Sequence, residues 1–222
     1  MTEVPSGRAV LSASLALGVA VALIGASYGV LAVANGLSVA QTSVMSLLVF
    51  TGASQFAAVG VIATGGSAAT AVGSGLLLAA RNSVYGLALA PMLRGSLARR
   101  LLAAHFVLDE STALATAQPD PKAQVRAFWV SGVSIFAFWN VGTLLGAVAG
   151  RALENPAALG LDAAFPAGFV VLIGPHLRSR AGRHAALLAA VLVILTTPFL
   201  RPGMPILVAA LAILVGLREA PE

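Results

Sequence analysis

The chain has 222 residues, of which 59% are hydrophobic and 9% are charged, and its mean hydropathy is +0.95. A soluble domain carries about 25% charged residues, and a disordered chain combines low hydrophobicity with high charge, so the composition excludes both classes. The net charge of +5 does not indicate nucleic-acid binding, because the basic residues are scattered between apolar runs instead of gathered on one face. The absence of cysteine excludes disulfides, thiolate metal sites and a cysteine nucleophile. The composition therefore predicts an integral membrane protein.

A membrane-spanning helix needs about 20 mostly apolar residues. In chain order the candidates are Val10–Ala34, Leu37–Ala63, Ala68–Met92, Leu97–Ala117, Phe128–Ala149, Leu161–Pro175, Ala185–Leu200 and Pro205–Leu217. The fourth contains ionisable residues and fits either a span that faces a bundle interior or an amphipathic surface helix. The sixth is short. We expect an all-α protein with seven or eight transmembrane helices in a single polytopic domain, 1–222, whose halves, 8–117 and 125–218, meet at the polar stretch Gln118–Gln124.

The loop cations predict the orientation, because cytoplasmic loops carry an excess of Lys and Arg. With the N-terminus inside and eight spans, the inside set is Arg8, Lys122, Arg126, Arg178, Arg180, Arg183 and Arg218. Arg94, Arg99 and Arg100 fall outside in this arrangement. They move inside if the fourth segment is a surface helix and an earlier segment is re-entrant. No pattern typical of a signal peptide is present.

Two short stretches indicate an internal repeat of the kind found in many transporters. The stretch Gly25–Gly29 precedes Asn35-Gly-Leu-Ser, and Asn140–Gly146 precedes Leu159-Gly-Leu-Asp162. Asp162 itself is expected to cap a helix.

The first polar group inside an apolar segment contains Gly52, Ser54 and Gln55. Small and hydroxyl residues permit close packing and hydrogen bonds between transmembrane helices. The alternative is a broken helix whose free backbone groups face a substrate in the middle of the membrane.

The second group contains Arg81, Asn82 and Tyr85, in the middle of the third segment. Arg81 lies too far from either end of this segment to reach the interface easily. Its planar guanidinium suits a carboxylate, so we expect either a structural ion pair with Asp109 or Glu110, or a site for an anionic group such as the carboxylate of an amino acid.

The third group contains His105, Asp109 and Glu110. Residues four apart share a face of a continuous helix, and an acid near a titratable histidine is the usual material of a proton relay. A wetted surface helix would carry the same residues. The sequence contains no metalloprotease, nucleophile-elbow or phosphate-loop motif, so we expect no enzymatic activity and no cofactor.

The chain resembles the AzlC family, the large subunits of branched-chain amino-acid exporters. The resemblance covers about 17–216 and rests on five ordered stretches, which are Gly36-Leu-Ser, Leu48-Val-Phe-Thr-Gly-Ala-Ser-Gln-Phe56, Ala80-Arg-Asn-Ser-Val-Tyr-Gly-Leu87, Asp109-Glu-Ser-Thr-Ala113 and Gly160-Leu-Asp-Ala-Ala-Phe-Pro166. It implies export of leucine, isoleucine and valine, and in some members methionine, across a bacterial inner membrane. It also implies a small AzlD-type partner subunit and coupling to the proton gradient.

Carried over by position, the family's Gly-Ser-Gln feature falls on Gly52, Ser54 and Gln55, its arginine on Arg81, and its acidic pair on Asp109 and Glu110. With the polar groups described above, we expect the substrate-binding residues to be Gly52, Ser54, Gln55, Arg81, Asn82 and Tyr85, and the proton-coupling residues to be His105, Asp109 and Glu110. Many members have a histidine after the arginine, whereas this chain has Asn82. This departure weakens the assignment of the substrate more than the assignment of the family. Two alternatives are an exporter of another small solute and a membrane scaffold or sensor that transports nothing.

Overall fold

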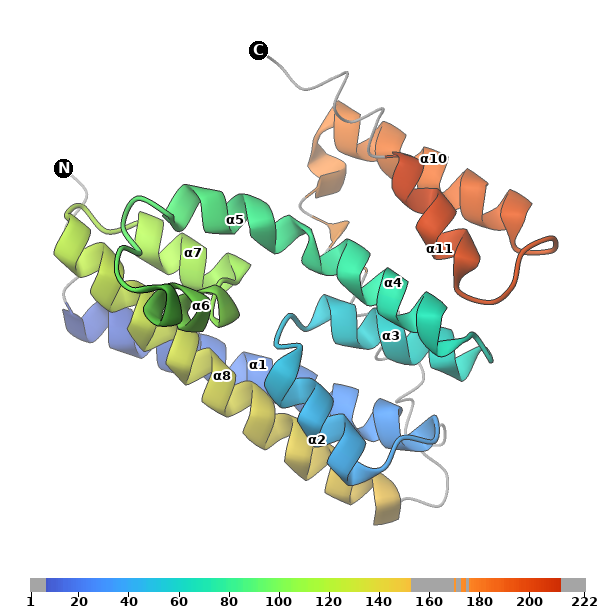
Figure 1. The fold of residues 1–222 in the computed structure, drawn as a ribbon, viewed down its shortest axis with the longest axis horizontal. Helices are drawn as coiled ribbons and strands as arrows, with labels where there is room; N and C mark the ends of the chain where they lie inside the picture. Colours follow the sequence, from blue (N-terminus) through green and yellow to red (C-terminus); the bar gives the residue numbers. More distant parts are fainter. Residues whose placement is uncertain (1–6, 153–169, 171–172, 175, 213–222) are drawn as a thin grey trace. The chain divides into compact units, whose positions relative to one another are not determined.

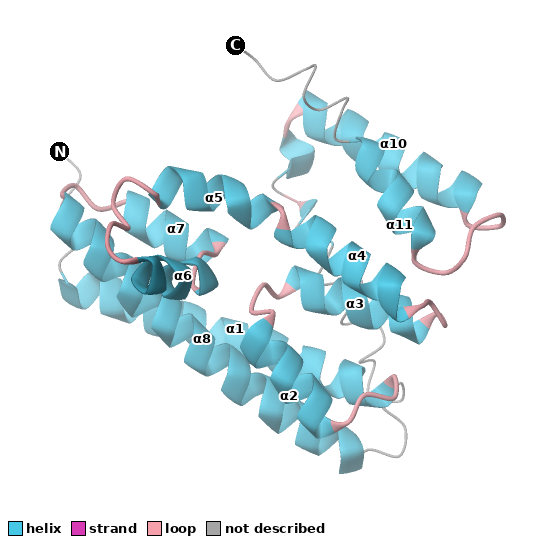
Figure 2. Ribbon diagram, viewed as in Figure 1, coloured by secondary structure: helices cyan, strands magenta, loops and turns pink. Residues whose placement is uncertain are grey.

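The structure is a computed structural model that describes residues 7–152, 170, 173–174 and 176–212. The described residues form helices and loops without a strand (Figure 2). The helices are α1 (Gly7–Ala34), α2 (Val39–Leu48), α3 (Ala53–Ala63), α4 (Ala68–Ala79), α5 (Arg81–Leu89), α6 (Leu97–His105), α7 (Asp109–Thr116), α8 (Pro121–Ala152), η2 (His176–Arg178), α10 (Arg180–Thr196), α11 (Met204–Ala209) and η3 (Ala210–Ala212) (Figure 1). The prediction of an all-α protein is confirmed.

Two of the described helices are long and apolar enough to cross a membrane, over Ala9–Ala34 and Pro121–Ala152. The next three predicted spans are each divided into two shorter helices, so seven or eight continuous spans are not confirmed. The sixth predicted span and the end of the last one lie largely outside the described residues, as does Asp162.

The chain forms two units, 1–52 with 79–156 and 53–78 with 157–222, and each is described by itself. The second unit contains α3, α4, α10 and α11. The first contains α1, α2 and α5 to α8, and the division of the chain into halves at Gln118–Gln124 stays a prediction.

Helices α1 and α8 form the centre of the first unit and lie side by side (Figure 1). Their contact is lined by glycines. A Cβ atom added at Gly142 would meet the carbonyl oxygen of Ala22, and one at Gly146 would meet that of Ala26. Because the partners advance along both helices together, α1 and α8 run in the same direction. Small residues permit this approach of two backbones, as they do in transmembrane helix pairs.

Helix α2 runs antiparallel to α8 along its second half. It begins with a capping box, in which the Ser38 hydroxyl accepts from the Gln41 N–H at 3.1 Å and the Gln41 side chain accepts from the Ser38 N–H at 2.8 Å. The Ser46 hydroxyl then donates to the Thr143 hydroxyl at 3.3 Å. After α2 ends, Gly52 lies next to the Trp139 ring, nearer the middle of α8.

Helix α7 runs antiparallel to α8 along its first half. The ring of Phe106, which precedes α7, lies 5.6 Å from that of Trp129. At the other end of α7 the chain turns sharply into α8, where the Asp120 carboxylate accepts from the N–H groups of Lys122 and Ala123 at 3.0 and 2.9 Å. Asp120 is therefore an N-cap followed by Pro121 at the first helical position.

Candidate functional site

Two helix breaks meet at the middle of α8 in the first unit. One is 49–52, after α2, and the other is 106–108, between α6 and α7. The ring of Phe50 lies 6.5 Å from that of Phe106 and 5.9 Å from that of His105, and all three contact Phe136 of α8 at 5.0 to 5.6 Å. An aromatic cluster thus joins the end of α2 to the start of α7.

The lengths of α2 and α7 show why this junction lies deep in the unit. At 1.5 Å per residue, the ten residues of α2 and the eight of α7 extend about 15 and 12 Å. The hydrocarbon core of a bilayer is about 30 Å thick, so neither helix crosses it alone. Non-helical backbone at such depth is tolerated only where protein or a water-filled cavity surrounds it.

A glycine permits the first break. Gly52 has φ +58°, in the left-handed region that other residues rarely adopt. The next residue, Ala53, already belongs to α3. Of the two interpretations of the Gly52–Gln55 group, a broken helix describes this backbone, which is interrupted over 49–52, and its role at a substrate stays a prediction.

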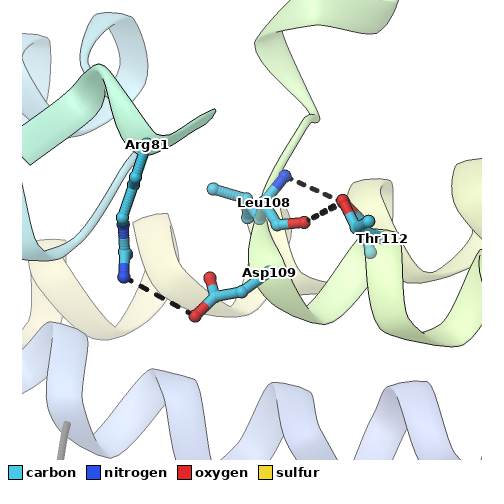
Figure 3. Close-up of polar contacts among 5 residues, drawn as sticks. Arg81, Leu108, Asp109 and Thr112 are labelled. Carbon is cyan, nitrogen blue, oxygen red and sulfur yellow. Dashed lines mark hydrogen bonds and ion pairs between the residues drawn. The ribbon is translucent and has the colours of Figure 1, made fainter. Parts of the chain in front are cut away.

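A serine stabilises the second break. The buried Ser111 hydroxyl donates to the Phe106 carbonyl at 2.6 Å and accepts from the Leu108 N–H at 3.0 Å. These bonds satisfy two backbone groups where α6 and α7 are interrupted. The close-up in Figure 3 shows this start of α7, where Thr112 also donates to the Leu108 carbonyl.

An ion pair connects this break to α5. Arg81, the first residue of α5, directs its guanidinium towards Asp109, the first residue of α7 (Figure 3), with Nη1 and Oδ2 3.8 Å apart. The side chains are 36% and 39% exposed. Asp109 and Glu110 lie in the first turn of α7, where the helix dipole favours negative charge. The site therefore combines a cation, two acids and an aromatic cluster.

A family model described as AzlC protein matches residues 16–153, which is more than half of the chain. The chain belongs to the AzlC family. This is the branched-chain amino acid transport family. The match runs from within α1 to the end of α8 and hence covers the whole of the site just described.

Comparison with curated proteins gives two similar relatives, from two strains of Helicobacter pylori. Each is named as an uncharacterized membrane protein and is 26% identical over 152 residues, or 68% of this chain and 66% of the relative. No solved structure matches the chain. The comparisons support a membrane protein with a transport-related function.

Of the predicted substrate residues of this AzlC-family chain, Gly52, Arg81, Asn82 and Tyr85 belong to the first unit, and Ser54 and Gln55 to the second. Ser54 and Gln55 are fully buried in the first turn of α3. Ser54 packs on α4, because a Cβ atom at Gly75 would lie 3.4 Å from the Ser54 carbonyl oxygen. Their role at a substrate stays a prediction.

The predicted proton-coupling residues are divided between two helices. His105 is the last residue of α6, and Asp109 and Glu110 begin α7. His105 and Asp109 were expected to share a face only on a continuous helix, and 106–108 interrupts the helix between them. His105 instead contacts the rings of Phe50, Phe106 and Phe136.

Several residues of the site were not predicted from the sequence. Tyr28 of α1 is fully buried and stacks on Trp139 at 6.0 Å. Thr51, within the first break, has a buried hydroxyl oxygen without a hydrogen-bond partner. Phe50 and Phe136 carry no polar group that would distinguish them from other core aromatics. The one available signal was the position of Thr51 beside a glycine inside an apolar segment.

The second unit also contains a cleft, with a volume of about 470 Å³. Its lining residues come from α3, α4, α10 and the segment around α11, and they include Ala57, Leu78, Val193, Pro202 and Ile206. None of the lining residues is charged, so this cleft offers no ionic group to an amino-acid carboxylate or ammonium.

Proposed function

We propose that the chain is the large subunit of a secondary exporter of branched-chain amino acids in a bacterial plasma membrane. Membership of the AzlC family carries this proposal. An ion pair beside two helix breaks in the first unit supports it, because transporters commonly bind substrate at interrupted helices near the middle of the bilayer. The expected substrates are leucine, isoleucine and valine, with methionine as a further candidate.

In this proposal Arg81 binds the substrate carboxylate. Its guanidinium is always protonated and presents donors in a geometry that suits a carboxylate. Gly52 and the backbone around it contribute polar groups, as do Asn82 and Tyr85. The aliphatic side chain of the substrate lies against apolar helices, and Asp109 or Glu110 exchanges the proton that couples export to the gradient.

The proposal includes a small AzlD-type membrane subunit and an N-terminus on the cytoplasmic side. Cells loaded with dipeptides of leucine, isoleucine, valine or methionine test export directly, because hydrolysis raises the internal pool of each amino acid. Intracellular pools are measured with this chain alone, with the small subunit alone and with both. A fall in one or more pools that requires both proteins supports the proposal.

A matched pair of variants tests the role of Arg81. Arg81→Ala should abolish efflux while the protein remains in the membrane. Arg94→Ala removes an exposed arginine that donates to the Pro91 carbonyl at 2.9 Å, away from the helix breaks, and should leave efflux unchanged. Efflux that persists in Arg81→Ala contradicts the carboxylate role.

Proton coupling is tested by the pH dependence of efflux. At least one of Asp109→Asn and Glu110→Gln should flatten this dependence, whereas Asp120→Asn, at the cap of α8, should not. An unchanged pH profile in both acidic variants removes these residues from the proton path. If no pool changes although both subunits reach the membrane, branched-chain export is wrong, and other small solutes and then a scaffold role become the leading functions.

A further inference from the structure

We propose that Arg81 and Asp109 together form a receptor for a zwitterion, in which Arg81 binds the carboxylate of an amino acid and Asp109 binds its α-ammonium group. This inference builds on the proposed function and assigns a second substrate-binding side chain. It replaces the coupling role of Asp109 and leaves Glu110 as the acid that exchanges a proton.

The first argument is that the ion pair does not use the hydrogen-bonding capacity of its members. Charge-assisted hydrogen bonds between Arg and a carboxylate are about 2.7 to 2.9 Å long, whereas Nη1 of Arg81 lies 3.8 Å from Oδ2 of Asp109. The Arg81 Nε is buried without a hydrogen-bond partner. Arg81 therefore keeps donors for an incoming carboxylate.

The second argument concerns the charge of the ligand. An anion at Arg81 would be repelled by Asp109, and a cation at Asp109 would be repelled by Arg81. A zwitterion places an opposite charge against each residue and adds no net charge to the site. Because uncompensated charge is costly inside a bilayer, a neutral but dipolar ligand is the best match.

The third argument is the chemistry of the neighbouring side chains. The break before Asp109 carries Phe106, whose ring contacts those of Phe50 and Phe136. Asn82, next to Arg81 in α5, has a buried Oδ1 without a hydrogen-bond partner, which is a further acceptor in the same turn. Apolar rings beside two opposite charges match an α-amino acid with an apolar side chain.

The ligands that test the inference are leucine, 2-hydroxyisocaproate and leucinamide. The second lacks the ammonium group of leucine and the third lacks its carboxylate. Binding is measured on the full chain, purified with its small subunit, by competition and by thermal shift, after a survey of all the common amino acids. The wild type should prefer leucine to each analogue by at least about tenfold, the effect of one hydrogen bond to a charged group. Equal binding of leucine and either analogue to the wild type overturns the inference without any variant.

Two variants should then separate the two preferences. Asp109→Asn should lose most of the preference for leucine over 2-hydroxyisocaproate and keep that over leucinamide. Arg81→Gln should do the reverse. The matched controls Arg94→Gln and Asp120→Asn remove one charge of each sign away from the site and should keep both preferences. If the ion pair only supports the structure, each variant should change both preferences equally or change neither. Either of these outcomes overturns the inference.

The same experiment distinguishes failure of the inference from failure of the proposed function. If another zwitterionic amino acid binds in place of leucine, and its corresponding analogues show the same separation, branched-chain export is wrong and the receptor stands. If leucine is exported but the variants do not separate the preferences, the receptor is wrong and export stands. Binding of no amino acid at all overturns the receptor.

Discussion

Replacing Gly146 with alanine should separate α1 from α8. The added Cβ atom would overlap the carbonyl oxygen of Ala26, and this oxygen is backbone that cannot turn aside as a side chain can. Gly86→Ala is the matched control, because Gly86 lies inside α5 and a Cβ there would meet nothing within 4 Å.

The expected magnitude follows from comparing the two variants. Alanine stabilises a helix interior over glycine by about 0.5 to 1 kcal/mol, and this gain is common to both. Overpacking a closely packed contact costs about 1 to 3 kcal/mol, and only Gly146→Ala incurs it. We therefore expect the free energy of unfolding of Gly146→Ala to be about 1 to 3 kcal/mol lower than that of Gly86→Ala.

Unfolding by SDS in mixed micelles, followed by intrinsic fluorescence, measures this difference. Trp129 and Trp139 are the two tryptophans of the chain and both belong to α8. If Gly146→Ala is as stable as Gly86→Ala, the contact between α1 and α8 is looser than described and the reasoning from backbone overlap is refuted.

Three further substitutions test the helix breaks and their attachment to α8 by the same unfolding assay. Ser111→Ala leaves the Leu108 N–H and the Phe106 carbonyl without their buried partner and should cost about 1 to 3 kcal/mol; a cost near zero would mean that other groups satisfy this break. Gly52→Ala should cost about 1 to 2 kcal/mol, because alanine disfavours φ +58°, and an unchanged stability would mean that the first break adopts another backbone conformation. Ser46→Ala removes the hydrogen bond to Thr143 and should cost about 0.6 kcal/mol, typical of such bonds between membrane helices; a cost of several kcal/mol would contradict this assignment.

The long helices of the fold were predictable from the sequence, and most of the interruptions were not. The predicted spans Val10–Ala34 and Phe128–Ala149 lie within α1 and α8, because each is a long apolar run without proline. The break at Gly52 had a signal, since glycine adopts positive φ at little cost. The break over 106–108 contains Phe, Val and Leu, which do not distinguish a loop from a buried helix.

The candidate site was likewise predictable from the sequence only in part. That Arg81 pairs with Asp109 was one of two predicted readings, because a charge inside an apolar segment needs a partner. The position of this ion pair near the aromatic cluster was not predictable from the sequence. It depends on α2 and α7, which reach the middle of α8 from opposite ends. The glycines of 25–29 and 140–146 were expected to mark a repeat, which stays a prediction. In the structure, the glycines of each stretch pack against the partner helix.

If α1 and α8 both cross the membrane, their common direction fixes the parity of the topology. Both helices then begin on the same face of the bilayer, so the chain between them crosses an odd number of times. If 97–117 does not cross, one of 39–63 and 68–89 crosses and the other returns to the face it entered. Because the chain has no cysteine, single substitutions at Arg94 and Lys122 can be labelled with an impermeant thiol reagent. Labelling from one face means that 97–117 returns to that face, and labelling from opposite faces means that it crosses.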